Sequence, residues 1–172
     1  MAMIRGLRGI TPKIGNDCFL AETATLIGEV FLGDKCTVWY NAVLRGDVNF
    51  ITVGNNTNIQ DGCVIHGTFK YASTSLGNDV SIGHNAIIHG CTINDRVLVG
   101  MGAIIMDKAV IGSDSVIAAG AVVLPGTIVE EGSVYAGIPA KRVKDIDENL
   151  LNVIKRTAVN YQKYASWYQD VG

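Results

Sequence analysis

An aliphatic residue recurs every six positions along most of this chain. The fourth residue after it is nearly always small or β-branched, as in the pair Ile105 and Ala109. Six is a multiple of the two-residue strand period but not of the 3.6-residue helical period, so both positions face one side only in extended chain. The pattern therefore predicts short strands that point their first and fifth positions into a core. The aliphatic positions are Ile14, Leu20, Leu26, Leu32, Val38, Leu44, Val53, Ile59, Ile65, Leu76, Ile82, Ile88, Ile93, Val99, Ile105, Ile111, Ile117, Val123 and Val129.

Stacked coils of such hexads form a parallel β-helix, in which each coil buries its aliphatic positions against the next coil. We expect glycines at or near the second position, such as Gly15, to relieve tight corners. The pattern resembles that of the hexapeptide-repeat proteins, and the resemblance implies triangular, left-handed coils of three hexads. We therefore predict an all-β fold: a single-stranded left-handed parallel β-helix over residues 1–138, followed by an α-helix.

The repeat stops after the segment GIPAK, residues 137–141. Apolar residues then recur at helical spacing, among them Ile146, Leu150, Ile154 and Tyr161, with acidic residues early and basic residues later. The sequence predicts a C-terminal helical segment over residues 139–172, packed on the outside of the β-helix or against a neighbouring subunit.

All three histidines of the chain lie between residues 63 and 91. With three hexads in a coil, His66 and His89 are second residues of hexads on the same side of adjacent coils, in an outward column that continues with Met106. Adjacent coils lie about 4.8 Å apart, the spacing of neighbouring strands. Two imidazoles at that spacing can both reach one cation at the ~2.0–2.1 Å that zinc requires.

His84 is the third residue of its hexad and projects from a different side of the prism. It cannot easily join the other two histidines within one chain. If copies associate about a threefold axis, His84 of one subunit can face His66 and His89 of the next. Three histidines with one open position are typical of catalytic rather than structural zinc. We therefore predict a homotrimer with His66, His84 and His89 as the metal ligands.

Two motifs precede the histidines: RGD, which contains Arg45 and Asp47, and NIQDG at residues 58–62. Their order before H…GHxxxxHGC, on hexad repeats, resembles the gamma-class carbonic anhydrases, and the resemblance covers essentially the whole chain. It implies a metal-dependent lyase that reversibly hydrates carbon dioxide to bicarbonate with a metal-bound hydroxide at trimer interfaces. It also implies Zn²⁺, or alternatively Fe²⁺, as the cofactor.

The same resemblance implies roles for residues around the metal. Arg45 and Asp47 match the pair that bridges adjacent subunits beside the site. Gln60 matches the glutamine that hydrogen-bonds the metal-bound water, and Asn58 is placed to orient its amide. Asp61 is interpreted as a residue that makes a turn.

The chain also departs from the best-studied form of the family. There, an acidic loop with a glutamate that shuttles protons follows the first histidine, whereas residues 67–75 here contain no acid. A second glutamate follows the RGD aspartate there, but Val48 and Asn49 follow Asp47 here. The resemblance makes Tyr161 or Tyr164 a candidate to reach over the site, as a tyrosine does in relatives, but the spacing of both also suits packing of the helix. Without these two acids, we expect buffer, water or another residue to move the proton.

Composition limits the partners. The net charge of −2, without a cluster of Lys and Arg, predicts no nucleic-acid partner and no binding to an anionic membrane. No apolar run approaches the ~18–20 residues of a membrane span, and the N-terminus does not resemble a signal peptide, so we expect a cytoplasmic protein. The four cysteines show no CxxC spacing and are interpreted as buried thiols.

Three other functions stay open on the sequence. A hexapeptide acyltransferase would transfer an acyl group from coenzyme A, but that chemistry needs one histidine base rather than three. A metal-stabilised scaffold or assembly subunit would keep the fold and the metal without turnover. Hydrolysis of a coenzyme A thioester would use the same zinc hydroxide on a carbonyl group.

Overall fold

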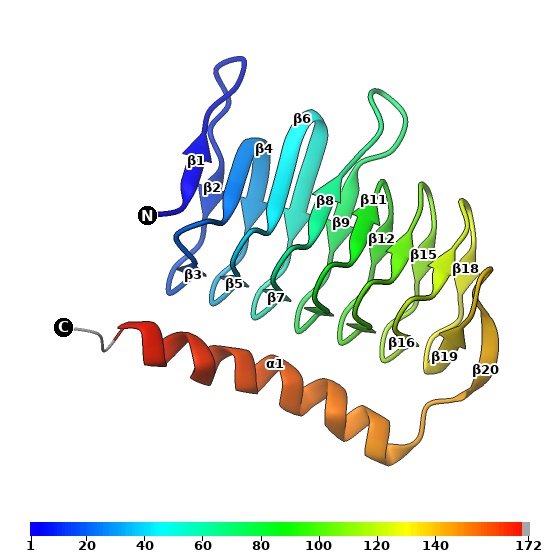
Figure 1. The fold of residues 1–172 in the computed structure, drawn as a ribbon. Helices are drawn as coiled ribbons and strands as arrows, with labels where there is room; N and C mark the ends of the chain where they lie inside the picture. The colour runs from blue at the N-terminus through cyan, green and yellow to red at the C-terminus, as the bar shows by residue number, and fades with distance from the viewer. Residues whose placement is uncertain (170–172) are drawn as a thin grey trace.

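A computed structural model describes residues 1–169 as a three-sided parallel β-helix with one long helix beside it (Figure 1). This confirms the predicted fold class. The first face contains β1 (Met3–Arg5), β4 (Thr25–Leu32), β6 (Val43–Val53), β8 (Val64–His66), β11 (Ile87–His89), β14 (Ile104–Ile105) and β17 (Val122–Val123). The second face contains β2 (Lys13–Ile14), β9 (Thr74–Leu76), β12 (Thr92–Ile93), β15 (Val110–Ile111) and β18 (Ile128–Val129), and the ends of β4 and β6 bend into it. The third face contains β3 (Phe19–Leu20), β5 (Thr37–Val38), β7 (Asn58–Ile59), β10 (Ser81–Ile82), β13 (Leu98–Val99), β16 (Val116–Ile117) and β19 (Ser133–Ala136).

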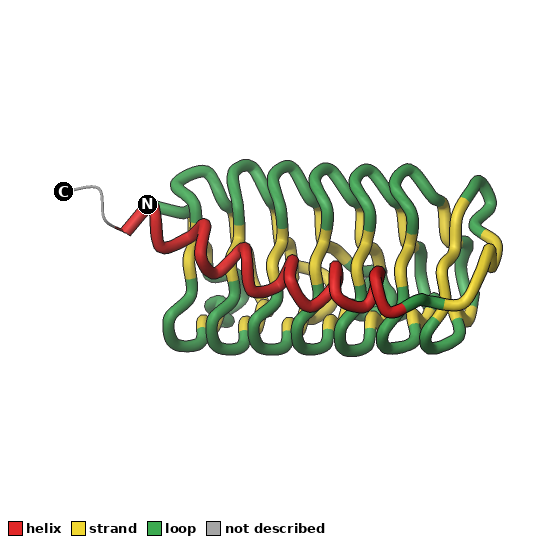
Figure 2. The backbone as a smooth tube through the Cα atoms, turned by 90° about the horizontal axis from the view of Figure 1, so that it is seen from below, coloured by secondary structure: helices red, strands yellow, loops and turns green. Residues whose placement is uncertain are grey.

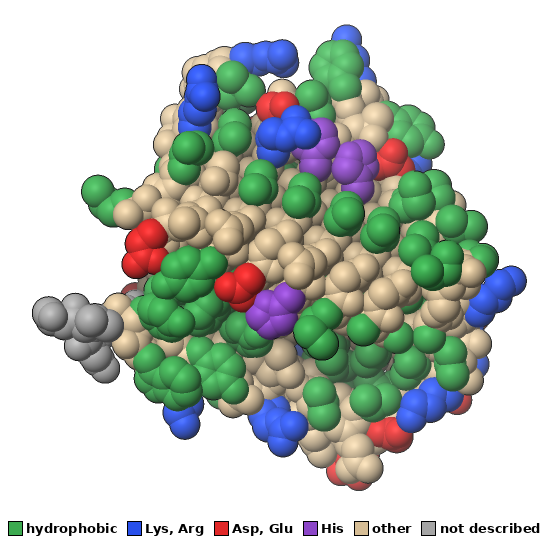
Figure 3. All heavy atoms as spheres, in the orientation of Figure 1, with side chains coloured by type: hydrophobic (Ala, Val, Ile, Leu, Met, Phe, Trp, Pro, Cys, Tyr) green, Lys and Arg blue, Asp and Glu red, His purple; other side chains and the backbone are tan. Residues whose placement is uncertain are grey.

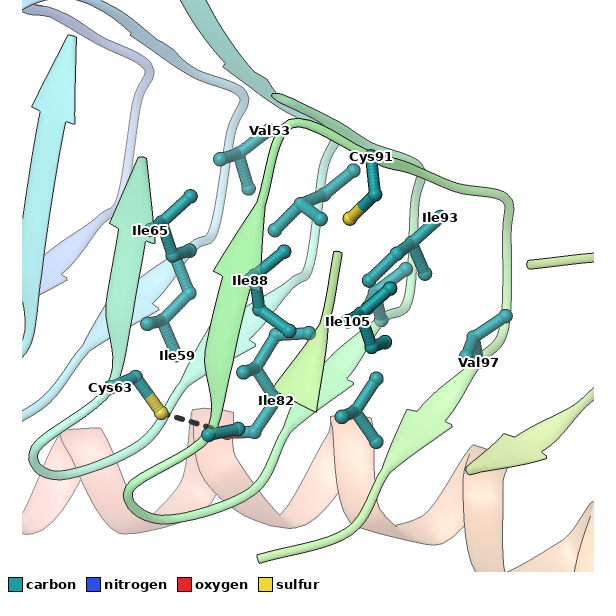
Figure 4. Packing of buried hydrophobic residues seen from close by; sticks show 14 of the residues in the cluster. Val53, Ile59, Cys63, Ile65, Ile82, Ile88, Cys91, Ile93, Val97 and Ile105 are labelled. Atoms are coloured by element: carbon teal, nitrogen blue, oxygen red, sulfur yellow. Dashed lines mark hydrogen bonds between the residues drawn. The ribbon is translucent and has the colours of Figure 1, made fainter. Parts of the chain in front are cut away.

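The aliphatic position of each hexad builds the core (Figure 4). Coils stack in register, so Ile88 pairs with Ile65 on one side and with Ile105 on the other. All three side chains are fully buried. Because every coil repeats this arrangement, the residues next to the aliphatic position point outward at fixed places on the first face.

The corners of the coils are not made by the glycines that we expected there. Non-glycine residues such as Asp17 and Lys35 adopt the positive φ of one corner, at 55° and 56°. Gly15, in contrast, is not among the residues of positive φ. A Cβ atom added to Gly15 would lie 2.5 Å from the carbonyl carbon of Gly33 on the next coil. The prediction that such glycines relieve corner strain is therefore wrong, because they permit close stacking of coils instead.

The C-terminal segment contains a strand as well as a helix. Strand β20 (Lys141–Asp145) pairs antiparallel with β19, where we predicted the helical segment. Helix α1 (Glu148–Gln169) begins after Asp147, whose carboxylate accepts a hydrogen bond from the backbone N–H of Leu150 at 2.8 Å. The helix runs along the β-helix (Figure 2), and Ile154 is fully buried against Val116 and Val134 of the third face. In the described part of the chain, no helix is both long and apolar enough to cross a bilayer. Residues 170–172 of the predicted segment lie outside the described residues.

Candidate metal centre

His66 and His89 face each other across neighbouring strands. The two residues are partners in the register of β8 and β11. Nδ1 of His66 lies 3.2 Å from Nε2 of His89. Their side chains are 15% and 35% exposed, so both rings are accessible at one edge of the first face. We call these two residues the histidine pair.

A carboxylate occupies the remaining nitrogen of each ring in the histidine pair. Nε2 of His66 lies 2.9 Å from Oδ1 of Asp47, and Nδ1 of His89 lies 2.8 Å from Oδ1 of Asp107. A ring that donates one N–H to a carboxylate presents the lone pair of its other nitrogen, which is the usual arrangement of histidine ligands to metals. Both facing nitrogens therefore have a lone pair available to bind a metal ion.

The separation of the facing nitrogens fits a shared cation. Two nitrogens that each lie ~2.0–2.1 Å from a tetrahedral zinc ion are roughly 3.3 Å apart. The observed separation is 3.2 Å. The donor set of the histidine pair therefore fits zinc, and imidazole nitrogen also suits ferrous iron.

Arg45 and Asp47 lie beside the histidine pair. Oδ2 of Asp47 accepts a hydrogen bond from the Arg45 guanidinium within the same chain, while Oδ1 contacts His66. Burial raises the pKa of the Asp47 carboxyl, but the contacts with His66 and Arg45 outweigh burial, and the net pKa is lowered. Asp47 therefore stays ionised and holds the His66 ring. The bridge between subunits that we expected for this pair stays a prediction.

Asp107 is the residue at this site that our sequence reasoning missed. It directly follows Met106, the residue of the outward column, in the sequence. One of its carboxylate oxygens contacts Nδ1 of His89, and the other accepts a hydrogen bond from the hydroxyl of Thr68 at 2.8 Å. The one signal in the sequence is an acid one coil beyond His89 and one position further along the hexad. Asp107 thereby links the His89 ring to the loop that follows His66.

His84 lies apart from the histidine pair, at the corner between β10 and β11. Its Nδ1 lies 2.9 Å from Oδ2 of Asp61, and its Nε2 lies 3.4 Å from the hydroxyl of Tyr161. Asp61, which we interpreted as a turn residue, therefore holds a histidine. Figure 3 shows two histidines together at one edge of the first face and the other near the opposite edge. Among residues 1–169, no group of three or more His, Cys, Asp and Glu side chains is arranged to hold a metal ion.

Aromatic side chains surround His84. Together with Asp61 they form an open pocket of about 280 Å³ lined by Trp39, Tyr40, Asp61, His84, Tyr161, Tyr164, Trp167 and Tyr168. Of the two tyrosines in α1 that we considered, Tyr161 contacts His84, whereas Tyr164 packs against Tyr161 and Trp167. Burial raises the pKa of Tyr161 to about 12, so its hydroxyl keeps its proton at neutral pH.

Gln60 lies on the same side as His84. It lines a second cleft of about 280 Å³ together with His84 and Tyr161. The buried Gln60 amide donates to Oδ1 of Asn58 at 3.0 Å, and Asn58 donates to Oγ of Ser81 at 2.7 Å. Asn58 therefore fixes the Gln60 amide. We call Gln60, Asp61, His84 and Tyr161 the His84 cluster.

An apolar surface separates the histidine pair from the His84 cluster. On the first face, Val64 and Ile87 directly precede the two strand-central isoleucines and are each 39% exposed. Met106 and Leu124 extend the exposed apolar side chains along the same face. Figure 3 shows hydrophobic side chains in a row across this surface. One chain therefore carries two sets of candidate site residues at opposite edges of an exposed apolar face.

Comparisons with known proteins add the family context. The family described as "Bacterial transferase hexapeptide (six repeats)" matches residues 90–125. A "Probable carbonic anhydrase" of Methanocaldococcus jannaschii is 51% identical over 87% of this chain and 94% of its own length. "Gamma carbonic anhydrase 2, mitochondrial" of Arabidopsis thaliana is 40% identical over 88% of this chain and 56% of its own length. A crystal structure of a hexapeptide transferase family protein from Anaplasma phagocytophilum has a TM-score of 0.92 at 38% identity, and the match covers 96% of this chain and 98% of that one.

Proposed function

This chain belongs to the gamma-class carbonic anhydrase family, and from that membership we propose that it reversibly hydrates carbon dioxide to bicarbonate at a metal ion shared between subunits. The observation that carries the proposal is the histidine pair. Its two facing nitrogens lie 3.2 Å apart, and a carboxylate holds the other nitrogen of each ring. Two facing lone pairs at this separation are stabilised by a cation between them, and this supports a metal ion at the pair.

The metal ligands in this proposal are His66 and His89 of one subunit and His84 of the next. These three neutral histidines would hold zinc or ferrous iron, which when bound would lower the pKa of water to about 7 and so make a nucleophile for carbon dioxide available at neutral pH. Asp47 and Asp107 hold the rings of the histidine pair in orientation. Gln60, fixed by Asn58, and Tyr161 supply the hydrogen bonds that orient the reacting groups beside His84.

The exposed apolar face supports the proposed homotrimer. A large apolar surface on a soluble chain is typical of an interface with another protein. Packing of this face against a second copy about a threefold axis covers Val64 and Ile87, and it carries the His84 cluster of one copy toward the histidine pair of its neighbour. Assembly therefore completes a site whose two halves no single chain brings together.

The loop after His66 bears on the rate of the reaction. Residues 67–75 contain Lys70 and hydroxyl groups but no carboxylate. The proton produced by hydration must then leave to water or buffer. We expect turnover that rises with buffer concentration and saturates at a higher buffer level than in an enzyme with its own shuttle.

The absence of an acid in this loop also favours a second candidate, a metal-binding assembly subunit without turnover. Stopped-flow hydration of carbon dioxide distinguishes the two functions. The protein is prepared anaerobically with measured zinc or ferrous iron content and compared with His89→Ala. Thr92→Ala, which changes an exposed strand residue of the second face, is the matched control.

Activity that follows the metal, vanishes in His89→Ala and persists in Thr92→Ala is the expected result. Full metal occupancy without hydration at any buffer concentration would overturn the proposal. Thioester hydrolysis by the same metal-loaded protein would then be measured, and a lack of that activity as well would leave the assembly subunit.

A further inference from the structure

Cys18 and Cys36 occupy the same place on the first two coils. Each comes directly before a strand of the third face, and these strands pair Phe19 with Thr37 in parallel. The backbone N–H of Phe19 donates to the carbonyl of Cys36 at 2.9 Å. The two cysteines are therefore stacked neighbours. The coil spacing of about 4.8 Å lies within the ~4.4–6.8 Å separation of Cα atoms in disulfides.

The other two cysteines have no such neighbour. The register of β6 and β8 places Cys63 beside Ala42, and that of β12 and β15 places Cys91 beside Ala109. Figure 4 shows Cys63 and Cys91 at separate places in the core. All four cysteines of the chain lie in the described part, so Cys18 and Cys36 are its one stacked pair.

The two thiols differ in access and in donor partners. Cys18 belongs to the terminal coil and is half-buried, whereas Cys36 lies one coil further in and is fully buried. Cys18 Sγ donates to the carbonyl of Gly33 at 3.2 Å, and Cys36 Sγ donates to that of Gly54 at 3.0 Å. A dissolved oxidant therefore reaches Cys18 first, and Cys36 lies next to Cys18 in the interior.

The chemistry of the pair agrees with its geometry. Hydrogen bonding from the Cys36 thiol lowers the pKa of Cys18 to about 7, against the opposing effect of burial. In the structure the Cys36 S–H donates to the carbonyl of Gly54, so this stabilisation requires that it turn toward the Cys18 thiolate once Cys18 loses its proton. The same contact and burial raise the pKa of Cys36. The half-buried member is therefore the more readily ionised of the two, while the fully buried member keeps its proton, and this divides the roles of attacking and resolving cysteine.

We propose that Cys18 and Cys36 form a reversible redox pair that a peroxide oxidises to a disulfide within the chain. The Cys18 thiolate attacks one peroxide oxygen, the O–O bond breaks, and an alkoxide or hydroxide leaves with the electron pair, so Cys18 becomes a sulfenic acid. Cys36 sulfur then attacks Cys18 sulfur, the S–O bond breaks, and the thiol proton leaves with the hydroxyl as water. A dithiol reductant reverses the change by exchange. None of these steps uses the metal or carbon dioxide.

The test counts thiols in the full-length protein, in a buffer with zinc and without iron. After a small excess of hydrogen peroxide, we expect the free thiols to fall from four to two and peptide mass spectrometry to find Cys18 joined to Cys36. Dithiothreitol should restore all four thiols. Four persistent thiols, or a disulfide through Cys63 or Cys91, would overturn the proposal.

Alanine variants separate the two roles. Alanine fills the fifth position of many hexads, such as Ala42 and Ala103, so Cys18→Ala and Cys36→Ala fit the narrow interior. Cys36→Ala should stop at a sulfenic acid that dimedone traps on Cys18, Cys18→Ala should keep its thiols, and Cys63→Ala is the control that still forms the disulfide. Equal loss of thiols in Cys18→Ala and the parent would refute the assignment.

A measurement on the unchanged protein covers the case of a variant that does not fold. The pH at which iodoacetamide labels Cys18 at half its maximal rate should lie below the ordinary thiol pKa of about 8.5. A midpoint at or above that value would refute the division of roles.

Discussion

Removal of the Asp107 carboxylate should weaken zinc binding although Asp107 is not itself a ligand in our proposal. Oδ1 of Asp107 lies 2.8 Å from Nδ1 of His89, and Oδ2 accepts from Thr68 at 2.8 Å. The carboxylate thus fixes the ring orientation and keeps the proton on Nδ1, which leaves Nε2 free for the metal. Asp107→Ala deletes both effects with one change.

The magnitude follows from that single contact. Loss of a carboxylate that holds a histidine ligand costs about 10–100-fold in metal affinity. That range corresponds to about 1.4–2.7 kcal/mol, which is the size of one hydrogen bond to a charged group. Asp107→Asn keeps an acceptor of similar shape but loses the charge, so its loss should be smaller than that of Asp107→Ala.

Competition between the metal-free protein and a chromophoric chelator measures the zinc affinity of each variant. Asp145→Ala is the control, because it removes the same charge from an exposed side chain of β20 that pairs with Arg142. Circular dichroism and sedimentation establish that each variant keeps the fold and assembly of the parent. A folded, normally assembled Asp107→Ala that binds zinc as tightly as the parent would refute the reasoning.

Three further outcomes are expected. His84→Ala should reduce the metal content of the assembled protein to a trace. Its circular dichroism should not change, because the 40% exposed side chain contributes little to the core. Stoichiometric metal in the variant would exclude His84 as a ligand. Ile105→Ala should lower the free energy of unfolding, measured by urea denaturation, by about 2–5 kcal/mol, because the Ile105 side chain is fully buried between coils. A loss below about 1 kcal/mol would contradict that packing. Asp114 accepts hydrogen bonds from Arg96 at 2.7 and 2.8 Å, and these lower the pKa of its carboxyl despite burial. The ion pair therefore stabilises the fold above the ordinary aspartate pKa of about 3.9, and this stabilisation disappears as the pH falls through the lowered pKa of Asp114. The difference in unfolding free energy between the parent and Asp114→Asn should shrink in acid. A difference that does not change with pH would count against the ion pair.

The hexad pattern predicted the core because burial in a β-helix depends on periodicity alone. Leu44, Ile65 and Ile88 repeat with the coil, and each is fully buried at the same place in successive coils. The same periodicity predicted that His66 and His89 would be neighbours and that His84 would point elsewhere. These positions follow from counting residues along a regular strand.

The carboxylates that hold the histidines did not follow from counting. Asp61 and Asp107 lie beyond the central strand positions, where the direction of a side chain depends on corner geometry rather than on the two-residue period. Their partners, His84 and His89, lie one coil away. The strand β20 was missed for a related reason. Its charged residues carry no hexad, and only pairing with β19 makes this segment extended.

The histidine pair derives its geometry from strands, whereas the proton release in our proposal depends on a loop. Ring centroids of His66 and His89 lie 5.2 Å apart with planes inclined at 59°, so the rings tilt and bring two nitrogens closer than the coils themselves. Asp47 and Asp107 maintain that tilt from either side. The loop over residues 67–75 contributes Thr68 to this arrangement but no acid. Because different elements carry the two properties, the missing acid in the loop bears, in our proposal, on the rate of proton release rather than on the binding of metal.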